Sequence, residues 1–407
     1  MAKHRVAVIH PQLGYGGSEA RALWTIEALK RDYSVTLITG GKVDLEHLNN
    51  YYGTSLQPGE FTNYEVQFPL GLDSTGKFAG LRGAWFTRAC RRLAPRFDVV
   101  TSAYNPCDFG VPLIQFVADF SFAPRLQRAL HPSLTSHRPW WYGDTWLRRA
   151  YLGLCQSLAP IRQENWKKNV TVANSRWTAG LLEREFGLVS HRVQFPPVPG
   201  DFPSVPWQQR ENGFVCVGRM VPEKRMDAMI SILDQVRKRG FDTHLHIVGG
   251  LEDSPFAKKV QALALQHRDW VFLEGRVAGK AKRELMCGHR FGINGCASEA
   301  FGIGVAELVK AGCITFVPNG GGQTEIVAHP MLIFEDEDDA VRRIVRVLGN
   351  SALQAELTAH LRDRSQDLSV ERFQGTIRAL VAEFLSTRGS QDTQTGKASE
   401  IAAGKGV

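Results

Sequence analysis

The chain has 407 residues, of which 43% are hydrophobic, and a formal net charge of +8. This length suffices for two domains of ordinary size, each with its own core. No apolar run reaches 18 residues, which excludes a helix that spans a bilayer, and the short apolar start at residues 6–9 is typical of a buried strand rather than a secretory signal. The seven scattered cysteines contain no C-x-x-C pair, so we expect no disulfide framework, no cysteine zinc site and a cytoplasmic location.

The positive charge lies in the first half of the chain. Residues 1–200 contain 23 Lys and Arg against 15 Asp and Glu, whereas residues 201–407 contain 26 of each. An anionic partner for the basic half would be nucleic acid, a membrane surface or a phosphorylated substrate, and solubility alone is the alternative. The chain has no nucleic-acid recognition motif, so we expect no nucleic acid partner.

Short apolar runs rich in β-formers alternate with segments of helical period, which predicts a parallel α/β architecture. In the first half we expect strands at residues 6–9, 35–39, 98–102, 113–117 and 170–173, and helices at 18–30, 81–93 and 176–186. In the second half we expect strands at residues 214–217, 244–248, 271–273, 291–294 and 314–317, and helices at 224–239, 255–267, 280–287 and 302–311. Further helices are expected at residues 351–364 and 371–387.

A proline-rich stretch at residues 195–200 interrupts both periodicities and is the best candidate for a linker. We therefore predict a first Rossmann-like domain at residues 1–197 and a second at 198–370, followed by a helix at 371–387 and a disordered tail at 388–407. Open α/β sheets bind ligands at the carboxyl ends of their strands. The expected site therefore lies in a cleft between the two domains.

Residues 120–168 are unusually rich in tryptophan and tyrosine, with arginines and lysines close by. Aromatic side chains beside basic ones are typical of a contact with a membrane interface. One interpretation is therefore a peripheral membrane contact through residues 138–152, on the cytosolic face. The alternative is an ordinary long helix that packs its aromatic side chains inward.

The strongest chemical signal is the segment 298–307, in which Glu299 and Glu307 lie eight positions apart across a glycine-containing turn that opens a helix. The main chain of Phe301, Gly302, Ile303 and Gly304 would lie at the helix start, where free N–H groups and the helix dipole favour a phosphate. Glu299 would then accept hydrogen bonds from sugar hydroxyls, and Glu307 from a ribose.

A second signal follows the strand at 214–217, where Gly218 precedes Arg219 and Lys224. A diphosphate leaving group gains negative charge as the bond to it breaks. Two cations directed at that charge would stabilise the transition state more than the ground state.

These segments together resemble the E-x7-E signature of retaining glycosyltransferases with the GT-B fold, glycosyltransferase family 4. The continuation at residues 308–313 and 320–327 is similar to that family's pattern as well. The resemblance implies two Rossmann-like domains whose parallel sheets face each other across a cleft. It also implies that Arg219 and Lys224 hold the donor diphosphate.

The resemblance is looser in the first domain. It implies that Gly16 and Gly17, in the turn after the first strand, let the backbone approach the donor. Many family members carry His-Asp at the end of the strand 113–117, where this chain has Ala118 and Asp119. We retain Asp119 as a sugar or acceptor contact, with a locally satisfied loop aspartate as the alternative. In the second domain, Arg276 follows the expected strand at 271–273, and the resemblance implies that this position binds the base.

The resulting hypothesis is a retaining transferase that moves a hexose-type sugar from a GDP- or UDP-linked donor to an acceptor hydroxyl. It would require no metal and no cofactor besides the donor. The acceptor is expected in glycan, lipid-linked oligosaccharide or envelope polysaccharide synthesis. The main alternative is a nucleotide-sugar epimerase of the same fold, which would need no acceptor.

Overall fold

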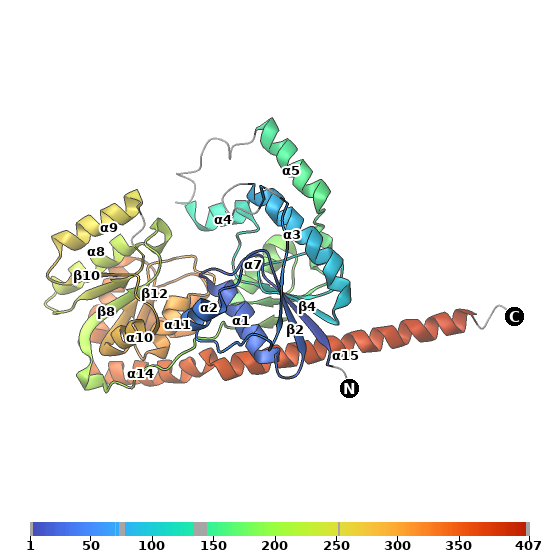
Figure 1. Cartoon of the computed structure of the whole chain (residues 1–407). Helices are drawn as coiled ribbons and strands as arrows, with labels where there is room; N and C mark the ends of the chain where they lie inside the picture. Colours follow the sequence, from blue (N-terminus) through green and yellow to red (C-terminus); the bar gives the residue numbers. More distant parts are fainter. Residues whose placement is uncertain (1–2, 70, 73–77, 133–144, 251–252, 404–407) are drawn as a thin grey trace.

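The computed structural model describes residues 3–69, 71–72, 78–132, 145–250 and 253–403, and contains two parallel sheets flanked by helices (Figure 1). The first sheet has seven strands in the order β3-β2-β1-β4-β5-β6-β7. Its strands are β1 Arg5–Ile9, β2 Ser34–Thr39, β3 Thr62–Glu65, β4 Val99–Ser102, β5 Ile114–Val117, β6 Val170–Ala173 and β7 Arg192–Val193. The α-helices of this half are α1 Gly17–Leu29, α2 Leu45–Tyr52, α3 Ala79–Leu93, α4 Pro124–Leu130, α5 Trp146–Leu158, α6 Gln163–Trp166 and α7 Arg176–Phe186.

The second sheet has six strands in the order β10-β9-β8-β11-β12-β13. Its strands are β8 Glu211–Val217, β9 Leu245–Val248, β10 Val271–Gly275, β11 His289–Ile293, β12 Ile314–Pro318 and β13 Ile333–Phe334. The α-helices that follow these strands are α8 Met226–Arg237, α9 Pro255–Gln266, α10 Gly279–Gly288, α11 Ile303–Lys310, α12 Gln323–Val327, α13 Glu337–Leu348, α14 Ser351–Ser365 and α15 Val370–Ala403.

Apart from the end of the last helix, the strands and helices predicted from the sequence are present within a few residues of their expected bounds. The central strands were recognisable because they are apolar runs buried on both faces. The short outer strands β3, β7 and β13 were not predicted. In β3 three of the four residues are exposed, so the strand has no apolar run to reveal it. The proline-rich stretch at 195–200 lies between β7 and β8, and the domain bounds at 197 and 198 remain a prediction.

Helix α15 begins in the second half of the chain and packs against the first sheet's core (Figure 1). Its buried apolar side chains fall on one stripe, formed by Phe373, Ile377, Leu380, Val381 and Phe384. The helix continues to Ala403, whereas the composition predicts disorder from residue 388. Once the first turns are docked, each further residue needs only to propagate an existing helix, and propagation is cheaper than nucleation.

Candidate functional site

The two side chains with the strongest sequence signals, Lys224 and Glu299, form an ion pair in the second domain. Lys224 follows β8 in a short 3-10 turn, and Glu299 follows β11, the neighbouring strand. Because both strands are parallel, the loops at their carboxyl ends lie at one edge of the sheet. About four fifths of each side chain is buried, so the pair lies in a partly desolvated setting.

The surroundings of Lys224 keep it charged. Burial lowers the pKa of its amine, but the negative charge of Glu299 raises that pKa, and the net result lies above the ordinary value for lysine. Lys224 is therefore a fixed cation at neutral pH. Such a cation beside a carboxylate suits a ligand that presents a diphosphate next to hydroxyl groups.

Arg219 lies on the same turn and has 72% of its side chain exposed, with its guanidinium 4.0 Å from Glu223. The Glu223 side chain is only 11% exposed, and its Oε2 is buried with no hydrogen-bond partner among the described residues. A buried carboxylate oxygen without a donor is costly. Glu223 is therefore a further candidate ligand contact that the sequence reasoning missed, because a glutamate in a loop carries no pattern that reveals its burial.

The start of α11 faces this pair without a side-chain cap. Gly302 occupies the position before the helix with φ of 100°, a conformation that favours glycine. A Cβ at Gly304 would lie 2.6 Å from the carbonyl oxygen of Val217, so the helix packs directly on the end of β8. The side chain of Phe301 is buried against Phe195, so only its main chain could contact a ligand.

Glu307 lies one turn further into α11 and is held by Lys282 of α10 at 2.6 Å. Both side chains are about four fifths buried. Lys282 was not singled out from the sequence, because a lysine within a predicted helix has no distinguishing pattern. A ribose bound by Glu307 would share this carboxylate with Lys282.

The glycine-rich turn of the first domain reaches the second domain. A Cβ at Gly17 would lie 2.8 Å from Cδ1 of Ile303, and the guanidinium of Arg276 lies 6.0 Å from the ring centroid of Tyr15. The turn is held in place by Tyr52, whose hydroxyl accepts from the N–H of Gly16. The structure therefore brings Gly17 and Arg276 to the junction of the two domains.

Asp119 lies at the end of β5 and is exposed to solvent. Its Oδ1 accepts hydrogen bonds from Nδ2 of Asn105 at 2.8 Å and from the N–H of Ser121 at 2.9 Å. Asn105 also accepts from the N–H of Ala118. Asp119 is thus satisfied locally through one oxygen, and its other oxygen faces no recorded donor among the residues described.

A histidine of the first domain lies within electrostatic range of the ion pair although position 118 is alanine. His131 directly follows α4 and is partly buried. Burial lowers its pKa, and the carboxylates of Glu223 and Glu299 raise it, with the net value below that of free histidine. Its helix α4 lies between two predicted elements, so no sequence pattern connects it with Glu299.

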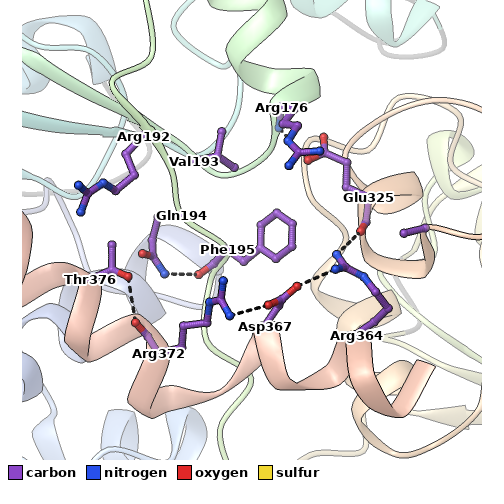
Figure 2. Close-up of a pocket in the computed structure, with 11 residues that line it drawn as sticks. Arg176, Arg192, Val193, Gln194, Phe195, Glu325, Arg364, Asp367, Arg372 and Thr376 are labelled. Atoms are coloured by element: carbon purple, nitrogen blue, oxygen red, sulfur yellow. Dashed lines mark hydrogen bonds and ion pairs between the residues drawn. The ribbon is translucent and has the colours of Figure 1, made fainter. Parts of the chain in front are cut away.

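A separate cavity of about 530 Å³ lies where the chain passes between the two domains (Figure 2). Figure 2 shows Asp367 between Arg364 and Arg372, with ion pairs of 2.7 and 2.8 Å. None of its lining residues belongs to the predicted site. They are Arg176, Arg192, Val193, Gln194, Phe195, Glu325, Ala328, Arg364, Asp367, Arg372 and Thr376.

Glu325 on the rim of this cavity joins the two domains. Its carboxylate accepts the N–H groups of Arg176 at 2.9 Å and Trp177 at 2.8 Å, at the start of α7. A carboxylate from the second domain thereby caps a helix of the first. The hydroxyl of Ser175 also donates to the carbonyl of Ala300, next to Glu299. The position of the Glu299 loop is therefore tied to the first domain.

The segment expected to contact a membrane is partly outside the described residues, since the structure describes nothing from 133 to 144. Within the described part, α5 has no buried residue, and Trp146, Leu147 and Leu154 are 70%, 62% and 58% exposed. This helix does not pack these side chains inward. In the part of the chain that the structure describes, no helix is long and apolar enough to cross a membrane.

Residues 199–364 match the family model described as Glycosyl transferases group 1, and this range contains both carboxylates and both cations of the candidate site. The second domain belongs to the glycosyl transferases group 1 family. The chain is also similar to curated proteins, each named as a GDP-Man:Man(3)GlcNAc(2)-PP-Dol alpha-1,2-mannosyltransferase. One from Neurospora crassa is 25% identical over 185 residues, and one from Dictyostelium discoideum is 26% identical over 182 residues.

Those alignments cover 38% and 39% of this chain and 33% and 36% of the relatives, so the chain spans about a third of the length of the curated relatives it matches. Solved glycosyltransferase structures extend the likeness to both domains. WaaG, from lipopolysaccharide biosynthesis, has a TM-score of 0.62 at 19% identity, covering 91% of this chain and 99% of WaaG.

Two further structures have the same architecture. HepE of Anabaena, solved with UDP and glucose, has a TM-score of 0.64 at 14% identity, covering 94% of this chain and 100% of HepE. A sucrose-phosphate synthase from Thermosynechococcus elongatus has a TM-score of 0.67 at 14% identity, covering 95% of this chain and 100% of the synthase. The fold is GT-B, as the sequence resemblance implies.

Proposed function

We propose that this chain is a retaining glycosyltransferase that moves a hexose-type sugar from a nucleotide-diphosphate donor to an acceptor hydroxyl. The single observation that carries the proposal is the Lys224–Glu299 pair beside the uncapped start of α11, within a domain of the group 1 family. UDP with glucose in HepE and a GDP-mannose-named activity in the curated relatives support the two donor classes.

In the proposed complex, Lys224, Arg219 and the first amides of α11 contact the diphosphate. As the bond from the sugar to the diphosphate breaks, negative charge grows on the leaving oxygen, and these groups stabilise it. They take the role that a metal ion plays in other phosphate sites, so the reaction requires no metal. Glu299 then accepts hydrogen bonds from the sugar hydroxyls, while Glu307 accepts those of the ribose.

The acceptor enters from the first domain, next to Asp119 and His131. A hydroxyl that attacks the anomeric carbon from the face that the diphosphate leaves gives retention of configuration, and its proton passes to the departing diphosphate oxygen. The partial positive charge on the sugar is then balanced by the departing diphosphate, which Lys224 holds close by. Gly16 and Gly17 let the main chain of the first domain approach the donor, and Arg276 contacts the base.

The exchange Glu299→Gln tests the site. It keeps the size of the side chain and removes the charge that orients the sugar, so kcat should fall by about 100- to 1,000-fold, the range for losing one such electrostatic contact. The assay is product formation from UDP- and GDP-linked hexoses chosen by thermal shift, with the product anomer read by NMR. Glu383→Gln, on the exposed face of α15, is the matched control.

Near-normal turnover in Glu299→Gln would contradict the assigned site. Inversion of the anomeric carbon would contradict the mechanism. Clean epimerisation of the nucleotide sugar without any acceptor would favour the epimerase alternative instead. Arg219→Ala should separately weaken the affinity for the nucleoside diphosphate product, and an unchanged affinity would remove Arg219 from the site.

The second part of the proposal is that α5 contacts an anionic membrane surface where a lipid-linked acceptor lies. Exposed Trp146, Leu147 and Leu154 on one short helix of the basic half support it. The double variant Trp146→Ser with Leu147→Ser should lose at least half of its co-sedimentation with vesicles that contain phosphatidylglycerol. Leu265→Ser, at a leucine that is 70% exposed in the second domain, should bind like the parent. Equal vesicle binding by the parent, the double variant and Leu265→Ser would contradict the membrane contact through α5.

A further inference from the structure

A cluster of three histidines lies at the amino ends of β9 and β11, the two strands that flank β8, at the opposite end of the second sheet from Lys224 and Glu299. His246 is on β9, His244 directly precedes it, and His289 is the first residue of β11. Each can offer one nitrogen such that all three nitrogens lie within 4.8 Å of one another. Glu211, the first residue of β8, lies between these strands in the sheet order.

We propose that this cluster binds a single divalent transition-metal ion of the zinc type, with His244, His246, His289 and Glu211 as ligands. Imidazole nitrogens with a carboxylate oxygen are a ligand set that suits zinc. Four protein ligands would make the site closed and structural rather than catalytic. The inference does not depend on the proposed transferase activity.

Hydrogen bonds already orient two of the rings for this role. Nδ1 of His289 lies 2.7 Å from the carbonyl oxygen of Leu285, which can only accept, so Nδ1 carries the proton. Nδ1 of His246 likewise lies 2.7 Å from the carboxylate of Glu274. In both rings the lone pair is therefore on Nε2. Metal-binding histidines typically have this outer arrangement, in which the other nitrogen donates to a carbonyl or carboxylate.

The three distances among His244, His289 and Glu211 are close to those between the ligand atoms of a tetrahedral ion. Nε2 of His289 and Nε2 of His244 lie 3.1 Å apart, and the carboxylate of Glu211 is 3.5 Å from the latter and 3.9 Å from the former. Zinc–nitrogen bonds of about 2.0–2.1 Å place ligand atoms about 3.3 Å apart in a tetrahedron. In the metal-free state the hydrogen bond between the two Nε2 atoms requires the proton of His244 on its Nε2. A metal ion bound there would shift that proton to Nδ1 of the same ring, which stays neutral.

Gly213 makes room for the rings. A Cβ at this position would lie 2.1 Å from Nε2 of His244, which no side chain could accommodate without moving the imidazole. Phe272 of β10 stacks on His246 with ring centroids 4.9 Å apart and limits the ring to its present orientation. His289 is buried, whereas His244 and Glu211 have 23% and 63% of their side chains exposed, which gives an ion a path from solvent.

The experiment is a calorimetric titration of the full-length chain, made without a histidine tag and stripped with chelator, using zinc chloride alone. We expect one ion per chain and a higher Tm with the ion bound. Cobalt(II) should give the visible absorption of a tetrahedral complex. Absence of saturable binding would overturn the proposal.

His244→Ala, at the more exposed histidine, should weaken zinc affinity at least 100-fold, and Glu211→Gln about tenfold. Gly213→Ala should weaken it without removing any ligand. His4→Asn, which changes an exposed histidine elsewhere, should bind like the parent. Far-UV circular dichroism verifies that each variant is folded. Parent-like affinity in folded His244→Ala would overturn the proposal, because binding would then come from other groups.

Discussion

The ion pair of Lys224 and Glu299 illustrates how burial couples function to stability at the scale of single residues. Removing one partner from a mostly buried pair leaves the other charge without compensation, which costs more than removing both. If a variant of Lys224 or Glu299 loses activity, its free energy of unfolding must therefore be measured as well. The exchange Glu299→Gln suits this purpose, because an amide oxygen still accepts a hydrogen bond from Lys224.

His10 is a second buried titratable residue, at the end of β1. Burial lowers its pKa to about 4, even though Glu19 raises it, and its Nε2 has no partner among the described residues. Below pH 6.5 the unfolded chain takes up a proton that the folded chain refuses until about pH 4. This residue therefore contributes stability that is fully present above pH 6.5 and is lost as the pH falls.

The exchange His10→Asn tests this, because the amide oxygen can replace Nδ1, which accepts from the N–H of Gln12. The parent should lose about 3 kcal/mol more of its free energy of unfolding between pH 6.5 and 4 than the variant does. Urea denaturation at several pH values measures the difference. His4→Asn, at an exposed site, should follow the parent curve, and parallel curves for all three would contradict the assignment.

At the scale of secondary structure, α15 is the element whose packing is most clearly read from its sequence. Phe373, Ile377 and Leu380 recur at helical spacing and are buried in the core of the first sheet. Gly375 lies on the exposed face of the same turns, and a Cβ there would meet no atom within 4 Å. Substitutions on the buried and exposed faces of this helix should therefore change the free energy of unfolding in opposite directions.

Phe373→Ala should lower the free energy of unfolding by about 3–5 kcal/mol, because it leaves a cavity where the side chain is 1% exposed. Gly375→Ala should raise it by about 0.5–1 kcal/mol, because alanine restricts the unfolded chain and favours the helix. Chemical denaturation of both variants measures the shifts. A destabilising Gly375→Ala would show that this helix face is not free in solution.

At the scale of the whole molecule, the two domains meet where Gly17 approaches Ile303. Gly17 does not have positive φ, so alanine is allowed by the backbone and only the neighbour opposes it. The added methyl group would lie 2.8 Å from Cδ1 of Ile303, and the domains must separate slightly or that side chain must move. This contact offers a direct test of whether domain closure controls activity.

Gly17→Ala should lower kcat/KM for the donor about tenfold with little change in Tm. The second exchange Ile303→Ala creates the missing space, and the double variant should recover most of the activity. Ile303→Ala alone serves as the control for the loss of the side chain itself. Strictly additive losses in the double variant would contradict steric coupling between the domains.

The sequence by itself determined the alternation of strands and helices, the GT-B resemblance and the residue types of the site. Short apolar runs rich in β-formers, such as 214–217, indicate buried strands of a parallel sheet, and the spacing of Glu299 and Glu307 is a local property of one turn and one helix. Edge strands such as β3 were not predicted, because a strand whose residues are mostly exposed has no continuous apolar run.

Only the tertiary structure decided which distant residues meet. The contact of Ser175 with Ala300 beside Glu299, the cap that Glu325 places on α7 and the cluster of His244 with His289 join positions far apart in the chain. Each depends on strand order and on the packing of one domain against the other. The pattern of residues along the chain predicts neither the strand order nor the domain packing. Contacts between distant residues form only when folding has closed the long loops between them.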